Sequence, residues 1–298
     1  MAERMRVLLA TDDSIAARVA EPWVTGGRWA KPPIVDVLSV AAPTVAAGPW
    51  LGRVRVGDAV GAIRELERAE HAQAEAVAEG VARRLAAAGV EADARAATGE
   101  PAAEILAAAK SLGSDLIMLG PRGRSELASA LLGGVSQQVL AHSPVPLLLA
   151  RPGNMAPDGL PHTVVLLVDG TLGALAAANW LGRTGWLAGC VVVLRALLGA
   201  APGLADDEHP VAGRVREAVD RAAREALGQL ADVVTAQASE VRVEMEAGHP
   251  LHAALAAESA HRSDLLVVAR RRPRPGDHPL ADKVTRYAST SVLMVPLP

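Results

Sequence analysis

The chain has 298 residues, half of them hydrophobic, with a formal net charge of −3 and an isoelectric point near 6.3. This length suits about two domains of ~100–200 residues each, and the near-neutral charge argues against a protein that coats nucleic acid. The single cysteine, Cys190, the lack of a signal-peptide pattern and the lack of a long uncharged apolar window predict a soluble cytoplasmic protein with no membrane segment.

Strands and helices alternate along the first half of the chain. Short continuous apolar runs at Arg6–Thr11 and Ile34–Val40 are typical of buried parallel strands. A long segment rich in Ala, Glu and Arg, roughly Val60–Ala88, predicts an amphipathic surface helix. The segment Pro101–Gly113 predicts a second helix, with proline at its start and glycine at its end. Three further strands are expected at "VEADARAATG", "DLIMLG" and "VPLLLA".

The second half of the chain repeats this order. "VLLATDDS" has a counterpart in "VLLVDGT", and "SPVPLLLARP" has one in "STSVLMVPLP". The strands expected in the second copy are Thr163–Val168, Cys190–Arg195, Glu240–Glu246, Asp264–Val268 and Val292–Val295. Alternating strands and helices imply a mainly parallel sheet with helices on both faces. We therefore expect two tandem Rossmann-like α/β domains, each with a five-stranded sheet, at 1–151 and 162–298, joined by a linker at 152–161.

A glycine-rich stretch, "GPRGRSELASALLGGVS", follows the predicted strand "DLIML" and leads into a helix. Gly120 and Asp12 each follow directly from a predicted strand, so both are expected at the sheet edge where ligands bind in such folds. A glycine loop that opens a helix suits phosphate, with Ser136 adding a hydroxyl and Arg122 or Arg124 a charge. The alternative is that Gly120 and Gly123 only form a turn and that Gly133 and Gly134 allow close helix packing. The glycines alone favour neither interpretation.

Other kinds of site have weaker support. The stretch is neither a Walker A motif nor G-x-G-x-x-G. In "VVLLVDGTLG", Leu167 stands where an Asp-x-Asp-Gly-Thr phosphatase loop has its nucleophile. The run Arg270–Arg274 is more typical of a solvated loop than of a nucleic-acid contact, and the scattered histidines predict no zinc site. No Ser-His-Asp or Cys-His set stands out, so we predict neither catalytic nor metal-binding residues.

The spacing "GPRG", nine residues, then "GGVS" resembles the G-x2-G-x9-G-(S/T) signature of the universal stress protein family. "ATDDS" stands where that family has a strand-end Asp followed by Gly-Ser, and "GEPAAEIL" and "SPVPLLLARP" resemble its helix start and terminal strand. The resemblance covers both halves. The chain therefore looks like a tandem member of the family, with adenine nucleotide alpha hydrolase-like domains.

The resemblance implies that the first copy binds ATP or a related adenine nucleotide, with or without Mg²⁺. Thr11 and Asp12 would contact the nucleoside, and Val40 would line the adenine pocket. The residues around the ribose and phosphates would be Gly120, Arg122, Gly123, Gly133, Gly134, Val135 and Ser136.

Two positions of the first copy depart from the family pattern. Gly134 replaces the usual Ser or Thr, which removes a hydroxyl donor worth roughly 1.5–3 kcal/mol toward a charged phosphate. A backbone N–H remains there, and Ser136 offers a substitute hydroxyl. Asp13 replaces the usual Gly and adds negative charge near the phosphates, which a metal or Arg124 would have to offset.

The second copy has lost the motif. Ala269, Arg272, Pro279 and Leu280 stand at or near the positions of the four glycines, whereas Asp169 survives at its strand end. Side chains at these positions block close backbone approach, and proline removes an N–H donor. We expect a degenerate copy that does not bind ATP in the usual way and serves as a structural or regulatory partner of the first copy.

Three functions remain open at this point. The first is a nucleotide-binding regulatory module of the stress response that acts on an unidentified protein partner. Its terminal strands "VPLLLA" and "SVLMVP" would pair within the chain as a pseudo-dimer or between chains as a homodimer. The second is an ATPase or another nucleotide-dependent enzyme, for which no general base is evident beyond slow hydrolysis. The third is a structural interaction protein that binds no nucleotide.

Overall fold

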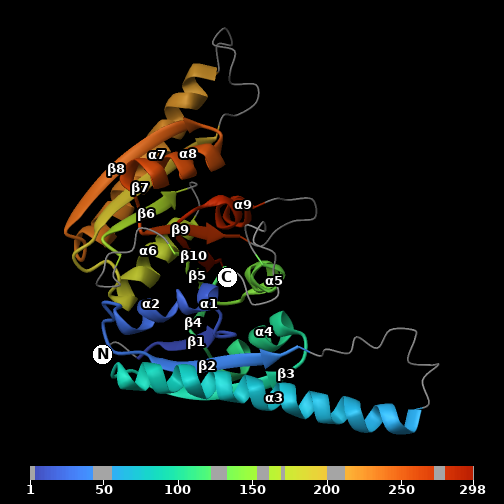
Figure 1. Ribbon diagram of the computed structural model, residues 1–298. Coiled ribbons are helices and arrows are strands. Elements are labelled where there is room, and N and C mark those ends of the chain that lie inside the picture. The colour runs from blue at the N-terminus through green and yellow to red at the C-terminus, as the bar shows by residue number, and fades with distance from the viewer. Residues whose placement is uncertain are drawn as a thin grey trace. The chain divides into compact units, whose positions relative to one another are not determined.

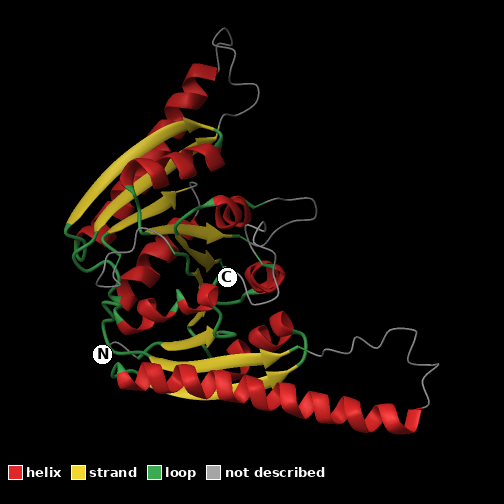
Figure 2. Cartoon of the chain, viewed as in Figure 1, coloured by secondary structure: helices red, strands yellow, loops and turns green. Residues whose placement is uncertain are grey.

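The computed structural model describes residues 4–42, 56–121, 133–152, 161–168, 172–199, 212–271 and 279–297. Strands and helices alternate through these ranges (Figures 1 and 2). The contacts within the chain define two compact units. The first unit comprises Arg4–Thr25 and Pro32–Ser143, and the second includes Gly26–Lys31 and Pro144–Pro298.

The first unit contains a parallel sheet whose strands lie in the order β3-β2-β1-β4. Its strands are β1 (Arg6–Ala10), β2 (Ile34–Ala41), β3 (Glu91–Thr98) and β4 (Leu116–Leu119). β1 is central, since Val7 lies in register with Val35 on one side and with Leu116 on the other. β4 is buried along its whole length, as its continuous apolar sequence predicts for a parallel strand.

Five helices connect and cover these strands: α1 (Ile15–Arg18), α2 (Glu21–Thr25), α3 (Val56–Ala87), α4 (Pro101–Leu112) and α5 (Gly134–His142). Right-handed crossovers place α1, α2 and α3 on one face of the sheet and α4 on the other. Consistent with this, α2 contacts α3, and α4 contacts α5. The Glu100 carboxylate caps α4 by accepting the Ala103 N–H at 2.7 Å, and Gly113 ends that helix at φ 64°.

The second unit repeats the parallel arrangement. Its strands lie in the order β5-β10-β9-β6-β7-β8. They are β5 (Leu147–Leu149), β6 (Thr163–Val168), β7 (Val191–Gly199), β8 (Glu240–Gly248), β9 (Leu265–Arg270) and β10 (Ser291–Pro296). Its helices are α6 (Leu172–Thr184), α7 (Ala212–Thr235), α8 (Pro250–His261) and α9 (Leu280–Tyr287). The prediction of a mainly parallel α/β fold repeated in tandem is confirmed.

The terminal strands of the two sequence copies pair with each other. β5 and β10 are antiparallel, with Leu148 opposite Leu293. Of the two pairings that the sequence left open, the one within the chain is therefore present. The segment 26–31 also belongs to the second unit. The Ala30 N–H donates to the Thr184 carbonyl at 2.7 Å. The rings of Trp29 and Trp186 pack edge to face, with their centroids 5.1 Å apart.

Buried polar groups join elements within each unit. In the first unit, the fully buried Asp36 carboxylate accepts hydrogen bonds from Arg6 at 2.7 Å and Arg95 at 2.6 Å, which ties β1, β2 and β3 together. Burial alone would raise the pKa of Asp36, but these two guanidinium groups outweigh it and hold the pKa below its usual value. In the second unit, one Glu258 oxygen accepts the N–H groups of Ser289 and Thr290, both at 2.7 Å.

Cys190 lies in the core of the second unit. Its thiol is hydrogen bonded to the carbonyl oxygens of Pro161 at 3.0 Å and Trp186 at 3.1 Å. Burial raises its pKa to about 11. Among the described residues, no helix is long and apolar enough to cross a membrane.

Candidate functional site

A cavity of about 530 Å³ opens in the first unit at the carboxyl ends of β1, β2 and β4. Its volume lies within the range of ~300–1,000 Å³ that is typical of small-molecule sites. β1 has β2 on one side and β4 on the other, so the chain reverses its direction across the sheet at β1. Open α/β sheets bind their ligands at this switch point.

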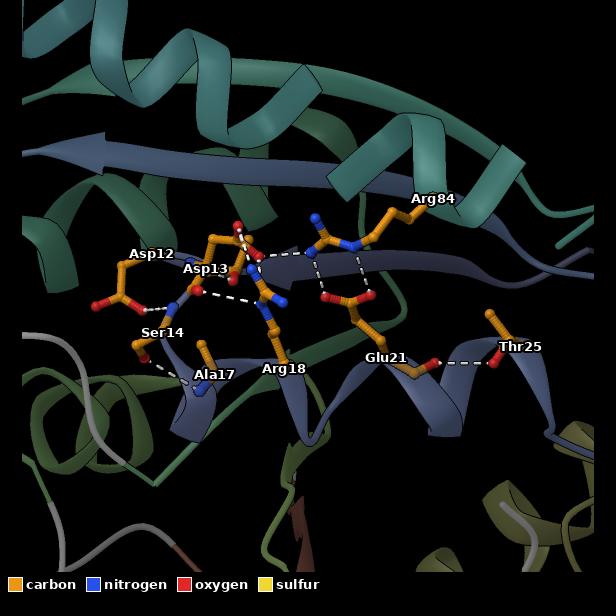
Figure 3. A network of polar contacts seen from close by, with 9 residues as sticks. Asp12, Asp13, Ser14, Ala17, Arg18, Glu21, Thr25 and Arg84 are labelled. Atoms are coloured by element: carbon orange, nitrogen blue, oxygen red, sulfur yellow. Dashed lines mark hydrogen bonds and ion pairs between the residues drawn. The ribbon is translucent and has the colours of Figure 1, made fainter. Parts of the chain in front are cut away.

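The end of β1 supplies the polar part of one wall. Thr11 and Asp12 line the cavity, and the Thr11 N–H donates to the Leu38 carbonyl at 2.9 Å. The Asp12 carboxylate accepts the Ser14 N–H at 3.0 Å (Figure 3). This local turn fixes the direction of the Asp12 side chain. A carboxylate held in this way can accept hydrogen bonds from ligand hydroxyl groups.

Asp13 turns away from Asp12 and joins a separate ionic network (Figure 3). Its backbone is left-handed, with φ 59°, a conformation that non-glycine residues other than Asn and Asp seldom adopt. Its carboxylate pairs with Arg18 at 3.0 Å and with Arg84 of α3 at 2.5 Å, and Arg84 also pairs with Glu21 at 2.7 Å. Burial alone would raise the pKa of Asp13, but hydrogen bonds and charge from Arg84 and Arg18 hold it below its usual value.

This network offsets the charge that Asp13 adds. The sequence suggested a metal or Arg124 for that role, and the structure shows Arg18 and Arg84 paired with Asp13. Arg124 lies outside the described residues. The network also links the β1–α1 turn to α2 and α3, so it holds the turn that carries Asp12.

The end of β4 and the start of α5 form another part of the wall. The Ser136 hydroxyl donates to the Gly120 carbonyl at 3.0 Å, and the Gly133 N–H donates to the Pro121 carbonyl at 2.8 Å. Gly133 is the N-cap of α5, and Val135 and Ser136 line the cavity from its first turn. N–H groups of a first helical turn have no acceptor within the helix and form its positive end, which suits an anion.

The Ser136 hydroxyl is thus already engaged as a donor. Its proton fastens the start of α5 to the end of β4, so an anion at this wall would meet backbone N–H groups. Gly120 has a separate role in packing. A Cβ there would lie 2.3 Å from the Ala16 oxygen and 2.8 Å from the Ala17 Cα. Glycine is therefore needed for the close approach of β4 to α1, a packing role that the sequence did not predict for this glycine.

β2 and the residue after it line the cavity from Leu38 to Ala42, a stretch that includes the predicted Val40. Much of the remaining lining comes from two helices that the sequence did not connect with the site, of which α4 contributes Pro101 and Ile105. α3 contributes Ala69, Glu70, Gln73, Ala74 and Val77. The helical period of α3 indicates which of its faces is apolar. It carries no information about which part of the sheet that face covers.

The predicted site residues fall into three groups. Those that line this one cavity are Thr11, Asp12, Val40, Gly120, Val135 and Ser136. Gly133 and Gly134 begin α5 beside it. Arg122 and Gly123 lie outside the described residues. Across the described ranges, no group of three His, Cys, Asp or Glu side chains is arranged to hold a metal ion.

The corresponding region of the second copy is built differently. β9 continues through Ala269 to Arg270, Pro279 is the N-cap of α9 and Leu280 is its first residue. The buried Arg270 pairs with Asp282 at 3.3 Å. Asp282 is the third residue of α9, as Ser136 is of α5, so the chain's own carboxylate lies in the positive first turn of the helix. Asp169 and Arg272 lie outside the described residues.

The fold and the cavity define a class: a tandem Rossmann-like α/β protein with a cavity at the switch point of its first unit. Comparison with known families identifies the family. The sequence model of the universal stress protein family matches residues 3–151 and again residues 161–296, so the chain belongs to that family.

Individual relatives agree with this assignment. A Thermus aquaticus protein, the universal stress protein in the QAH/OAS sulfhydrylase 3′ region, is 45% identical over 89 residues, which are 30% of this chain and 59% of the relative. Universal stress protein YxiE of Bacillus subtilis is 48% identical over 63 residues, 21% of this chain and 43% of the relative. The matched segments thus span less than two thirds of these relatives.

Among solved structures, a universal stress protein from Archaeoglobus fulgidus DSM 4304 is similar over 98% of both chains, with a TM-score of 0.63. At 21% sequence identity, this similarity supports the fold alone.

Proposed function

We propose that the first copy binds an adenine nucleotide, ATP, in this cavity, and that the chain is a nucleotide-dependent regulatory module of the stress response. The observation that carries the proposal is that residues from four separate sequence segments line one cavity of about 530 Å³. They are Thr11 and Asp12, Val40, Gly120, and Val135 with Ser136. Membership of the universal stress protein family supports it.

The chemistry of the walls fits the parts of a nucleotide. Asp12 can accept hydrogen bonds from ribose hydroxyls, and Val40 belongs to the apolar surface that a base would cover. The start of α5, from Gly133 to Ser136, offers the positive end of a helix to phosphates. We propose that Arg122 and Gly123 complete the phosphate contacts. Any Mg²⁺ in the site would be bound to the phosphates of the nucleotide.

The two departures from the family pattern have different consequences. Asp13 does not weaken binding in this account, because Arg18 and Arg84 neutralise it. Gly134 weakens binding, because the Ser136 hydroxyl, the substitute for the lost donor, already donates to the Gly120 carbonyl. We therefore expect an affinity about ten- to a hundredfold below that of a site with the usual hydroxyl.

The β5–β10 pairing supports a pseudo-dimer within one chain, in place of a homodimer through these strands. The Arg270–Asp282 pair supports a second copy that serves as a partner of the first and does not bind ATP in the usual way. We further propose an output through a protein partner and a cytoplasmic location.

A variant pair tests the nucleotide site directly. Val135→Asp places a carboxylate in the first turn of α5, where it favours the helix but repels phosphates. Val135→Asn has nearly the same shape without the charge. Calorimetric titration with Mg-ATP should show binding to wild type and to Val135→Asn, and none to Val135→Asp. Equal ATP affinities of the Asp and Asn variants, each with a native melting temperature, would overturn the proposed position of the phosphates.

A further inference from the structure

We propose that Glu70 and Gln73 of α3 hydrogen bond to the base in this cavity. They select a purine with an amino group at C6 over one with a carbonyl oxygen at C6. This inference rests on the proposed nucleotide site and assigns its specificity. Glu70 and Gln73 lie on α3, which the sequence predicts as an amphipathic surface helix.

One face of α3 lies on the cavity. The lining residues Ala69, Glu70, Gln73, Ala74 and Val77 recur at the spacing of adjacent helical turns. Ala74 and Val77 are buried, which fixes this face of the helix against the unit. Small and apolar side chains thus form most of the wall, and Glu70 and Gln73 are its two polar members.

Position on the cavity distinguishes these two side chains from the other polar residues of the helix, several of which are paired elsewhere. His71 is hydrogen bonded to Thr98, Arg83 pairs with Glu79, and Arg84 pairs with Asp13 and Glu21. Glu70 and Gln73 have no hydrogen bond or ion pair with another residue of the described ranges. Glu70 is nevertheless half-buried. A carboxylate that is partly withdrawn from water beside an apolar wall is stabilised when a ligand donates a hydrogen bond to it.

The distribution of charge sets the orientation of the ligand. Phosphates are drawn to the positive start of α5, near Val135 and Ser136, and repelled by the carboxylate of Glu70. The base therefore lies at the α3 side of the cavity. A carboxylate can only accept hydrogen bonds, so Glu70 favours an amino group, whereas a carbonyl oxygen at the same place faces it unpaired. The Gln73 amide can donate to a ring nitrogen.

Adenine and hypoxanthine differ at C6, where adenine carries an amino group and hypoxanthine carries a carbonyl oxygen. Sites that hydrogen bond to a ligand group discriminate strongly against an analogue that lacks it. For a bond to a charged acceptor we expect wild type to bind ATP about ten- to a hundredfold more tightly than inosine triphosphate. Glu70→Ala should bring this ratio close to one.

The test compares the two nucleotides by calorimetry on wild type, Glu70→Ala and a matched control, Glu75→Ala. Glu75 is an exposed residue of the same helix outside the cavity, so its removal changes net charge equally. The control should keep the wild-type ratio. Glu70→Gln should lie between wild type and Glu70→Ala, because its amide oxygen still accepts a hydrogen bond.

Three other results are informative. If Glu70→Ala binds both triphosphates more tightly by the same factor, Glu70 acts only by repelling phosphate and the inference is overturned. An unchanged ratio, or a wild-type preference for inosine triphosphate, also overturns it while leaving the nucleotide site intact. If wild type binds neither nucleotide, the proposed function itself fails, and the inference fails with it.

Discussion

Replacing Gly120 with alanine adds one methyl group where the end of β4 meets α1. The added carbon would lie 2.3 Å from the Ala16 oxygen and 2.8 Å from the Ala17 Cα. Both neighbours are backbone atoms, so no side-chain rotation relieves the contact and α1 has to move. Overpacking of this kind costs about 1–3 kcal/mol. At about 2–4 °C per kcal/mol, we expect the first unit to melt several degrees lower.

The matched control is Gly80→Ala in α3, where an added Cβ meets nothing within 4 Å. Alanine is favoured over glycine inside a helix by about 0.5–1 kcal/mol, so this variant should melt slightly higher than wild type. Scanning calorimetry of the three proteins measures both shifts. A melting temperature for Gly120→Ala at or above that of wild type would refute the argument that close packing on α1 requires glycine there.

Further predictions concern buried groups. Asp36→Asn should destabilise the first unit by about 3 kcal/mol, the lower end of the range for a broken buried ion pair, because Arg6 and Arg95 are each about a third exposed (35% and 38%). The pKa of Asp36 is lowered by folding, so its stabilisation is complete above about pH 3.9 and is lost as the pH falls through the folded pKa. Acid titrations of unfolding should show this loss in wild type and not in Asp36→Asn. Glu258→Ala leaves the buried Thr290 N–H and the part-buried Ser289 N–H without their acceptor and should cost about 1–3 kcal/mol in urea unfolding, while Glu258→Gln should cost less. The Cys190 thiol, with a pKa of about 11, should resist thiol reagents at pH 8 until the chain unfolds; rapid labelling of native protein would contradict its burial.

The inner strands were predictable because parallel strands inside a sheet are buried on both faces and therefore have unbroken apolar sequences. Thr163–Val168 was predicted with its observed bounds. Ile34–Val40 was predicted one residue short of β2. The helix at Pro101 was predictable from its proline start and its glycine end. The short helices α1 and α2 were not, because nine residues in two pieces show too little periodicity for a helix prediction.

The site was predictable only where local sequence determines position. A residue that directly follows a strand must lie at the edge of the sheet. Asp12 and Gly120 can therefore be placed at that edge without knowledge of the other elements of the fold. The partners of Asp13 could not be predicted in this way, because Arg84 is 71 residues away and only the packing of α3 brings it near. The contribution of Glu70 to the cavity depends on the same packing.

The most direct test of the central claim is the number of ATP molecules that one chain binds, measured by calorimetric titration of the intact protein with Mg-ATP. We expect one ATP per chain, bound in the first copy. Two per chain would show that the Arg270–Asp282 pair does not close the second copy to nucleotide. No heat of binding, together with an unchanged melting temperature in excess ATP, would contradict the proposal that the first copy binds a nucleotide.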